Sequence, residues 1–262
     1  MVGLEGCSSR GGDYGAVSLP CLRRSQVPGE NGDVSKDFFK FPSTPHLAIL
    51  GGNAVRDDKV MSERESEEFL RHELVVEEKV DGANLGIAFN SSGNLRTQNR
   101  GAYLPAPFSG QWTQLSAWLA PRRDVLFDAL TDQLILFGEW CYAQHSILYD
   151  RLPDWFLGFD IFDKNKERFF SCQRRDALLR RVDIAGVPEL KRGRFSLQEL
   201  KRLLAKSRLS ENPAEGLYLR FDEGEWLGQR AKLVRPEFIQ AVEEHWSRKG
   251  IKPNRLGWEA RA

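Results

Sequence analysis

A lysine framed by carboxylates and a glycine turn is the most chemically informative feature of the sequence. It lies in the segment Glu77-Glu78-Lys79-Val80-Asp81-Gly82-Ala83-Asn84. A lysine amine attacks phosphorus only after losing its proton, so a site must lower its pKa from about 10.4 by desolvation or nearby cations. The flanking acids oppose that shift, and the cations available elsewhere are Arg100, Arg230 and Lys232. By itself, K-x-D-G is also typical of an exposed turn.

Two further carboxylates lie within apolar segments. Glu139 belongs to Phe137-Gly138-Glu139-Trp140, and Glu215 precedes Gly216-Leu217-Tyr218-Leu219-Arg220. Because an unpaired charge on a buried strand is costly, we expect each carboxylate to meet a ligand or a basic partner. Phe159 lies in another aromatic segment and, taken alone, is most simply a core residue.

Periodicity and turn signals predict the elements that carry these residues. Ser62 and Glu65 form a capping box for a helix ending near residue 72, and a second helix is expected between Ser109 and Pro121. Further helices are expected to begin at Ser196 and Pro236, and strands are expected over residues 74–76, 85–89, 95–97, 134–141, 155–162, 216–221 and 231–234. Without strict β-α-β alternation, the pattern predicts an α+β domain over residues 36–262 with a short helical C-terminal tail. Residues 1–35 are rich in glycine, lack periodicity and are predicted to be disordered.

Composition narrows the functional class. The 262 residues include 38 Lys plus Arg and 37 Asp plus Glu, which excludes a wholly disordered or strongly basic protein. The apolar runs fall far short of the roughly 20 residues that cross a bilayer, so no membrane partner is expected. Four widely separated cysteines favour a reducing, intracellular location, cytoplasmic or nuclear, while residues 1–35 leave a targeting signal open.

Positive charge is concentrated in residues 174–208. This range holds eight Arg and three Lys against four acids, a net charge of +7 in a chain whose total is +1. A solvated face of two helices and a surface that binds a phosphate backbone both explain the excess. Only the second predicts a steep salt dependence of binding.

In their order along the chain, these segments resemble the motifs of the covalent nucleotidyltransferases, the superfamily of ATP-dependent DNA and RNA ligases and mRNA capping enzymes. The resemblance runs from about residue 41 to residue 239. Lys79-Val80-Asp81-Gly82 matches the adenylation motif, and Asn84 matches an asparagine of the phage-type RNA ligase 2 group. Arg100 matches the arginine after the first hairpin. Three further motifs are matched by residues 137–140, 156–161 and 215–220, and Arg230-Ala231-Lys232 replaces the closing K-x-K motif.

The resemblance implies a role for each matched residue. Lys79 would attack the α-phosphate of ATP and become lysyl-AMP, while Lys232 and Arg230 would neutralise charge on the phosphate oxygens. Many relatives carry lysine at position 230, and arginine offers a planar fork instead of a compact ammonium. The implied nucleotide contacts are Glu139 to the ribose hydroxyls, Phe159 to the adenine face, Glu78 to the adenine amino group, Arg100 to a ribose or incoming phosphate, and Asn84 elsewhere in the same site. Glu215 would help to position a divalent metal, Mg²⁺ or Mn²⁺.

The function implied by the resemblance is an ATP-dependent RNA ligase that passes AMP to a 5′-phosphate end, after which a 3′-hydroxyl attacks. Its partners would be RNA ends, including those of a nicked duplex. The implied fold is the nucleotidyltransferase α+β domain, with antiparallel sheets around a nucleotide cleft. Only about 30 residues follow Lys232, too few for the OB-fold of DNA ligases and capping enzymes. The alternatives are a DNA ligase and a non-catalytic nucleic-acid-binding module on a decayed transferase scaffold.

Overall fold

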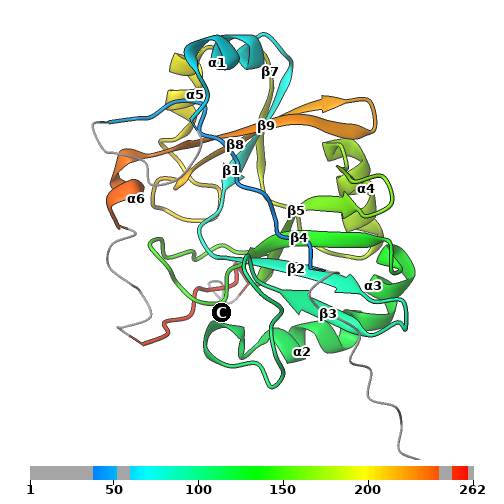
Figure 1. Cartoon of the computed structure of the whole chain (residues 1–262). Coiled ribbons are helices and arrows are strands. Elements are labelled where there is room, and N and C mark those ends of the chain that lie inside the picture. Colours follow the sequence, from blue (N-terminus) through cyan, green and yellow to red (C-terminus); the bar gives the residue numbers. More distant parts are fainter. Residues whose placement is uncertain (1–37, 52–59, 242–249, 259–262) are drawn as a thin grey trace, which may run out of the picture. The chain divides into compact units, whose positions relative to one another are not determined.

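The computed structural model describes residues 38–51, 60–241 and 250–258, which form two antiparallel sheets with helices (Figure 1). The predicted disorder of residues 1–35 lies outside the described residues, as does the part beyond residue 241 of the helix predicted to begin at Pro236. None of the helices in the described ranges has the length and apolar character that a bilayer span requires.

The first sheet has four strands and carries the predicted lysine. Its order is β7 (Glu189–Gly193), β1 (Leu74–Lys79), β8 (Gly216–Glu223) and β9 (Trp226–Val234). Helices α1 (Glu63–Leu70) and α5 (Leu197–Leu203) supply residues to the apolar core on one face of this sheet. Both helices begin with the capping box expected from their sequences, at Ser62–Glu65 and Ser196–Glu199.

Alternation along these strands separates an apolar face from a polar one. On β1, Leu74 and Val76 belong to the core shared with α1 and α5, whereas Glu77 forms a buried ion pair with Arg175. The register pairs Glu77 with Tyr218 and Tyr218 with Lys232, and it pairs Lys79 with Gly216. Since successive side chains point to opposite faces, Glu77, Lys79, Tyr218 and Lys232 share the polar face.

The second sheet has five strands in the order β3 (Leu95–Gln98), β2 (Ala83–Phe89), β4 (Leu134–Trp140), β5 (Phe156–Asp163) and β6 (Arg168–Phe169). Its larger apolar core is shared with α2 (Leu115–Leu119), α3 (Arg123–Leu130) and α4 (Cys172–Arg181). The β2–β3 hairpin forms where the sequence predicts it. A last short helix, α6 (Pro236–Ala241), follows β9.

The pairing of β4 with β5 has an irregularity in register beside the site. Between β4 and β5 the register pairs Phe137 with Asp160 and Gly138 with Gly158, so that Phe159 is passed over. The carbonyl oxygen of Phe159 accepts hydrogen bonds from the guanidiniums of Arg175 at 2.8 Å and Arg220 at 3.1 Å. Such bulges often redirect a side chain next to a functional site, and here two buried cations hold the freed carbonyl.

The segment 38–48 contacts both sheets. Phe39 and Phe41 pack on the second sheet beside Phe137, whereas the backbone of Lys232 in β9 donates to Pro45 at 2.9 Å and accepts from Leu47 at 2.8 Å. This segment therefore links the sheets at the level of the pocket described below.

One helix predicted from the sequence is shorter than expected. In place of a single helix between Ser109 and Pro121, the chain forms a 3₁₀ turn (Gly110–Trp112), α2, a second 3₁₀ turn (Ala120–Arg122) and then α3. Ser109 makes no side-chain cap, and Pro121 lies in the first turn of its element, where its missing N–H costs nothing. The helix α2 thus ends before the proline, as expected, and α3 follows as a second helix that the sequence did not predict.

Candidate active site

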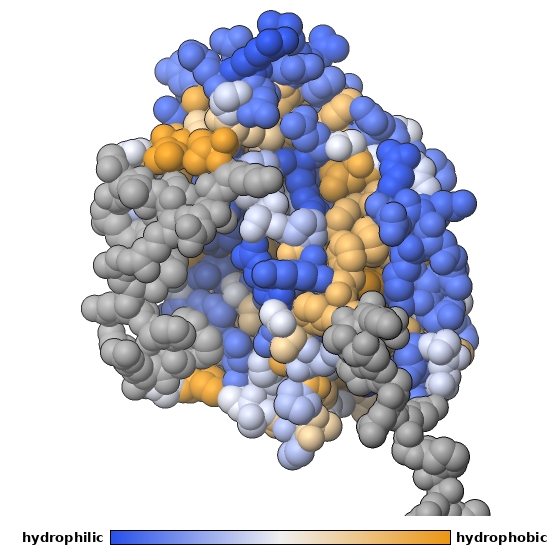
Figure 2. All heavy atoms as spheres, in the orientation of Figure 1, coloured by the Kyte–Doolittle hydropathy of each residue, from blue (hydrophilic) through white to orange (hydrophobic). Residues whose placement is uncertain are grey.

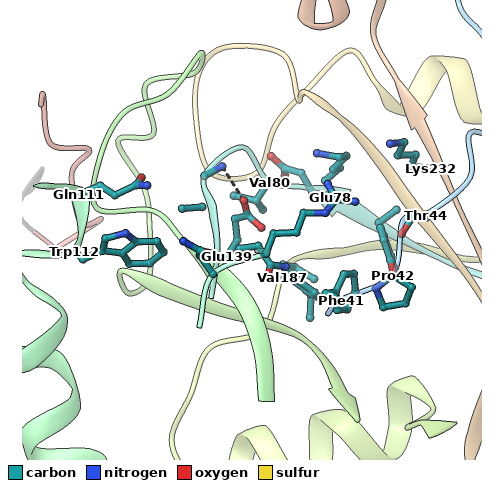
Figure 3. A pocket seen from close by; sticks show the side chains of 18 residues that line it. Phe41, Pro42, Thr44, Glu78, Val80, Gln111, Trp112, Glu139, Val187 and Lys232 are labelled. Carbon is teal, nitrogen blue, oxygen red and sulfur yellow. Dashed lines mark hydrogen bonds between the residues drawn. The ribbon is translucent and has the colours of Figure 1, made fainter. Parts of the chain in front are cut away.

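A cavity of about 440 Å³ is lined by residues of both sheets, and Lys79 is one of them. Figure 3 shows the side chains that line it. Of the residues predicted for the site, seven line it: Glu78, Lys79, Asn84, Arg100, Glu139, Phe159 and Lys232. Gln111 and Trp112 lie at one end of the cavity in Figure 3, and Lys232, Thr44 and Pro42 lie at the other. Figure 2 shows hydrophilic and apolar side chains meeting in a recess at the centre of the face that it presents.

The Lys79 amine is bound to a carboxylate. Its Nζ lies 2.7 Å from both carboxylate oxygens of Glu215, which immediately precedes β8. The two side chains are 29% and 13% exposed. Burial works to lower the pKa of Lys79, but the negative charges of Glu215, Glu139 and Asp81 outweigh it and raise the pKa above 10.5. The amine is therefore protonated at neutral pH.

Glu139 lies opposite Asn84 on the neighbouring strand β2. Its Oε1 accepts a hydrogen bond from the backbone N–H of Gly82 at 3.0 Å. Burial, reinforced by Glu215 and Asp81, raises the pKa of Glu139 to about 8 although Lys79 acts in the opposite direction. The Asn84 carboxamide oxygen is buried without a hydrogen-bond partner in the described part of the chain. A buried polar atom of this kind calls for a ligand or a water.

An apolar wall faces the cavity beside these polar groups. It contains Phe159, Phe41 and Val187. The Phe159 ring is half-buried and meets the Phe41 ring edge to face, with centroids 5.4 Å apart. A flat apolar group bordered by carboxylates and cations is the usual composition of a pocket for a small polar aromatic ligand.

The cations lie at two other points of the lining. Arg100 follows β3, is exposed, and donates from Nη2 to Ser43 Oγ at 3.0 Å. Lys232 lies on β9, next to the backbone of residues 45–47. Lys79 is thus flanked by acids, with cations elsewhere in the same cavity.

The sequence profile of the RNA ligase family matches residues 72–234, which is more than half of the chain and contains all nine predicted site residues. The chain belongs to the RNA ligase family. No curated protein matches it in sequence.

Solved structures of Naegleria gruberi RNA ligase share the fold of this RNA ligase family member. A mutant apo form is 19% identical with a TM-score of 0.52, over 68% of this chain and 54% of that one. A mutant form with ATP and Mn is 18% identical with a TM-score of 0.55, over 79% and 62% of the two chains. A form with PPi is 19% identical with a TM-score of 0.52, over 79% and 65%. The chain thus spans between about half and two thirds of the structures that it resembles.

Glu78 of this RNA ligase family member has two hydrogen-bond partners within the protein. Both oxygens of Glu78 accept hydrogen bonds, from Ser207 Oγ at 2.5 Å and from the Arg208 backbone N–H at 2.8 Å. Burial raises the pKa of this carboxyl despite those donors. Glu78 would have to exchange or share these partners to read an adenine amino group.

Arg230 does not belong to the lining of the cavity. Its Nη1 donates to Asp160 Oδ2 at 2.8 Å, and its guanidinium lies 4.6 Å and 4.4 Å from the ring centroids of Phe41 and Phe169. Asp160 also pairs with Arg220, whose side chain is fully buried. In this structure Arg230 therefore contacts Asp160 and two aromatic rings, and its predicted contact with phosphates stays a prediction.

Sequence reasoning missed several lining residues. Tyr218 lies between Leu217 and Leu219 on an apolar strand, where nothing distinguishes it from a core residue. Gln111 and Trp112 fall in the segment between Ser109 and Pro121 that was predicted as one helix, but they lie in the 3₁₀ turn before α2 and line the cavity.

The predicted metal ligand Glu215 contacts Lys79 but is not itself among the lining residues of the cavity. Within the described ranges, no three His, Cys, Asp or Glu side chains are grouped so that they could hold a metal ion by themselves. A cation at Glu215 would accordingly need further ligands, such as water or phosphate oxygens.

Proposed function

We propose that this chain is an ATP-dependent RNA ligase that acts through a covalent lysyl-AMP. The supporting observation is the position of Lys79, whose amine shares one cavity with Glu139, Phe159 and Lys232 and contacts Glu215. The solved RNA ligase of similar fold that is described with ATP and Mn supports the choice of nucleotide and of divalent metal. The partners would be the 5′-phosphate and 3′-hydroxyl ends of RNA.

The residues of the cavity suit a nucleotide. Its volume of about 440 Å³ falls in the range of small-molecule sites. The buried Asn84 oxygen and the Glu139 carboxyl would meet polar groups of the nucleoside, and the Phe159 ring would stack on the base. Lys232 would meet the phosphates and stabilise charge that grows on their oxygens as the Lys79 amine attacks.

The proton on Lys79 has to leave before the amine can attack, and Glu215 now holds that proton in place. The residues fit a divalent cation that takes Glu215 as one ligand and phosphate oxygens as others, the arrangement that Mg²⁺ prefers. When bound, such a cation supplies positive charge near the amine and the phosphates.

The decisive experiment is incubation with α-labelled ATP and Mg²⁺. Label should become fixed to the wild-type chain and should be absent from Lys79→Ala. Labelling of the wild type and of Lys79→Ala alike, or of neither, would contradict the proposed mechanism.

A DNA ligase remains a distinct alternative at the same site. Nicked duplexes with a 3′-OH RNA strand or a 3′-OH DNA strand separate the two, because an RNA ligase should seal the first at a higher rate. Failure to seal RNA would reject the proposed substrate. A non-catalytic binding module would bind RNA without acquiring label.

The basic range 174–208 supports RNA as the partner, although its charge is not all on the surface. Arg175 is 2% exposed and pairs with Glu77 inside the protein. Nine other cations of this range are exposed: Arg180, Arg181, Lys191, Arg192, Arg194, Lys201, Arg202, Lys206 and Arg208. We propose that they contact the RNA backbone, in which case affinity should fall steeply with salt.

A further inference from the structure

Residues 250–258, which we term the C-terminal strap, run along the loop of residues 141–152 between β4 and β5 (Figure 1). Five backbone hydrogen bonds of 2.8 to 3.3 Å join the two segments. Their donors and acceptors are Gln144 to Lys252, Asn254 to Tyr142, Arg255 to Tyr149, Leu152 to Arg255, and Gly257 to Leu152. Backbone hydrogen bonds thus join residues 252–257 of the strap to the loop.

Asn254 is the buried centre of this junction, with 2% of its surface exposed. Its Oδ1 accepts from the backbone N–H of Tyr149 at 2.9 Å. Its Nδ2 donates to the carbonyls of Cys141 at 2.8 Å and Ala143 at 3.3 Å. The Asn254 side chain therefore binds the loop at Cys141, Ala143 and Tyr149, and both N–H donors of its carboxamide are used.

The same loop holds the turn that follows Lys79. The Tyr149 hydroxyl accepts from the backbone N–H of Asp81 at 2.8 Å. The Asp81 carboxylate in turn accepts from the backbone N–H groups of Ser146 at 2.7 Å and Ile147 at 3.3 Å. Apolar packing reinforces these bonds, since Val80 belongs to one buried cluster with Tyr149 and with Leu256 of the strap.

We infer that Asn254 is a positioning residue for the nucleotidyl transfer, acting through Tyr149 on the Asp81 turn and hence on the Lys79 amine. Lys79 lies two positions before Asp81 in the sequence. Gly82, whose backbone N–H donates to Glu139, directly follows Asp81. Small displacements of a nucleophile are costly, on the order of a hundredfold in rate for 1 Å. The inference rests on the proposed function.

Two variants test the connection. Tyr149→Phe removes only the hydroxyl that accepts from Asp81, and Asn254→Ala removes three hydrogen bonds at the other end of the route. Each should lower the single-turnover rate of covalent AMP labelling at saturating ATP by about tenfold, with the half-saturating ATP concentration changed by less than about twofold. Because both act on the same turn, the double variant should lose less than the product of the two single effects.

Ser171→Ala is the control for instability alone. Ser171 is 3% exposed and caps α4, so its loss should weaken the fold by about 1 kcal/mol without changing the labelling rate of folded protein. Wild-type rates in Tyr149→Phe and Asn254→Ala, or multiplicative effects in the double variant, would overturn the inference.

Hydrogen exchange separates the failure of this inference from the failure of the proposed function. It needs no activity and follows the backbone amides of residues 79–84 directly. Asn254→Ala should speed their exchange relative to wild type and to Ser171→Ala. Unchanged exchange would reject the route even if the wild type labels normally, whereas faster exchange in a protein that never acquires AMP would support the route and reject the activity.

Discussion

The ammonium of Lys79 lies 2.7 Å from each oxygen of the Glu215 carboxylate, although the two residues are 136 positions apart in the sequence. The contact joins the end of β1 to the residue before β8, which are neighbours in the sheet. It holds the amine in the cavity and at the same time keeps it protonated. Glu215 thus positions the proposed nucleophile but keeps it in its unreactive, protonated form. A second cation bound to Glu215 would weaken that effect.

The first prediction concerns the pH dependence of AMP labelling. Only the neutral amine attacks, and the pKa of Lys79 is raised, so the labelling rate should keep rising with pH through the alkaline range. Glu215→Gln removes the nearest negative charge and should shift that rise to lower pH, although the weaker metal site should reduce the maximal rate by about tenfold or more. Single-turnover labelling at saturating ATP and Mg²⁺ over about pH 6 to 10 measures both effects.

Glu211→Gln is the matched control for this prediction. Glu211 lies four residues earlier, is 81% exposed and pairs with Arg151 instead of Lys79. Its pH profile should coincide with that of the wild type. A Glu215→Gln profile that also coincides would contradict the control of the lysine by Glu215.

Much of the fold was predictable because its local signals are strong. The capping boxes at Ser62 and Ser196 and the alternating strands around Glu139 and Lys79 each depend on neighbours within a few residues. The motif order also predicted that Lys79, Glu139, Phe159 and Lys232 share one cavity.

The contacts that tune the site depend on distant residues and were not predictable in the same way. Arg230 follows the K-x-K pattern of a phosphate ligand, yet Asp160 attracts its guanidinium into the layer between the sheets. The two arginines that hold the Phe159 carbonyl and the strap that holds the Asp81 turn leave no periodic signature. A sequence pattern identifies residues along one strand, but it does not identify the charged residue on another strand that will contact them.

A second prediction follows from the raised pKa of Glu139. Its folded pKa of about 8 exceeds the ordinary 4.5, so the folded protein binds the proton more tightly than the unfolded chain. The stability contributed by the neutral acid is complete below about pH 4.5 and is lost as pH rises through about 8. The glutamine of Glu139→Gln stays neutral and can still accept a hydrogen bond from Gly82. The melting temperature of this variant should therefore rise relative to that of the wild type as the pH increases.

Thermal unfolding at several pH values across this window measures the difference between the two proteins. Asp150→Asn provides the comparison, since it also removes a carboxylate but lies outside the lining of the cavity, half-exposed beside Arg151. A constant difference between Glu139→Gln and wild type from about pH 5 to 9 would show that Glu139 ionises normally.

The third prediction concerns Gly82, where the backbone turns next to Glu139. A Cβ there would lie 2.7 Å from the Trp140 carbonyl oxygen and 3.0 Å from the Glu139 Cγ. Because the first contact is with backbone, Gly82→Ala should displace the turn, lower the free energy of unfolding by about 1 to 3 kcal/mol and abolish labelling. At Gly101, where the nearest atom to an added Cβ is 3.8 Å away, the same change should alter stability by less than about 0.5 kcal/mol. Denaturant unfolding and AMP labelling of both variants check the contrast.

The fourth prediction separates the two cations of the Arg230-Ala231-Lys232 segment. Arg230 pairs with Asp160 and lies over two aromatic rings, whereas Lys232 lines the cavity. Arg230→Lys should lower the free energy of unfolding by about 1 to 2 kcal/mol, because lysine loses the planar contact with both rings, and should leave the half-saturating ATP concentration within about twofold of wild type.

Lys232→Ala should show the opposite division of effects. Removal of a cation that meets the phosphates should slow AMP labelling by about tenfold or more and raise the half-saturating ATP concentration, with little change in unfolding. Chemical denaturation of the two variants gives their free energies of unfolding, and labelling titrations give their labelling rates and half-saturating ATP concentrations. If Arg230→Lys instead weakens ATP binding while its unfolding stays at the wild-type value, Arg230 leaves Asp160 when the nucleotide binds, and its assignment as a residue of the inter-sheet layer would have to be abandoned.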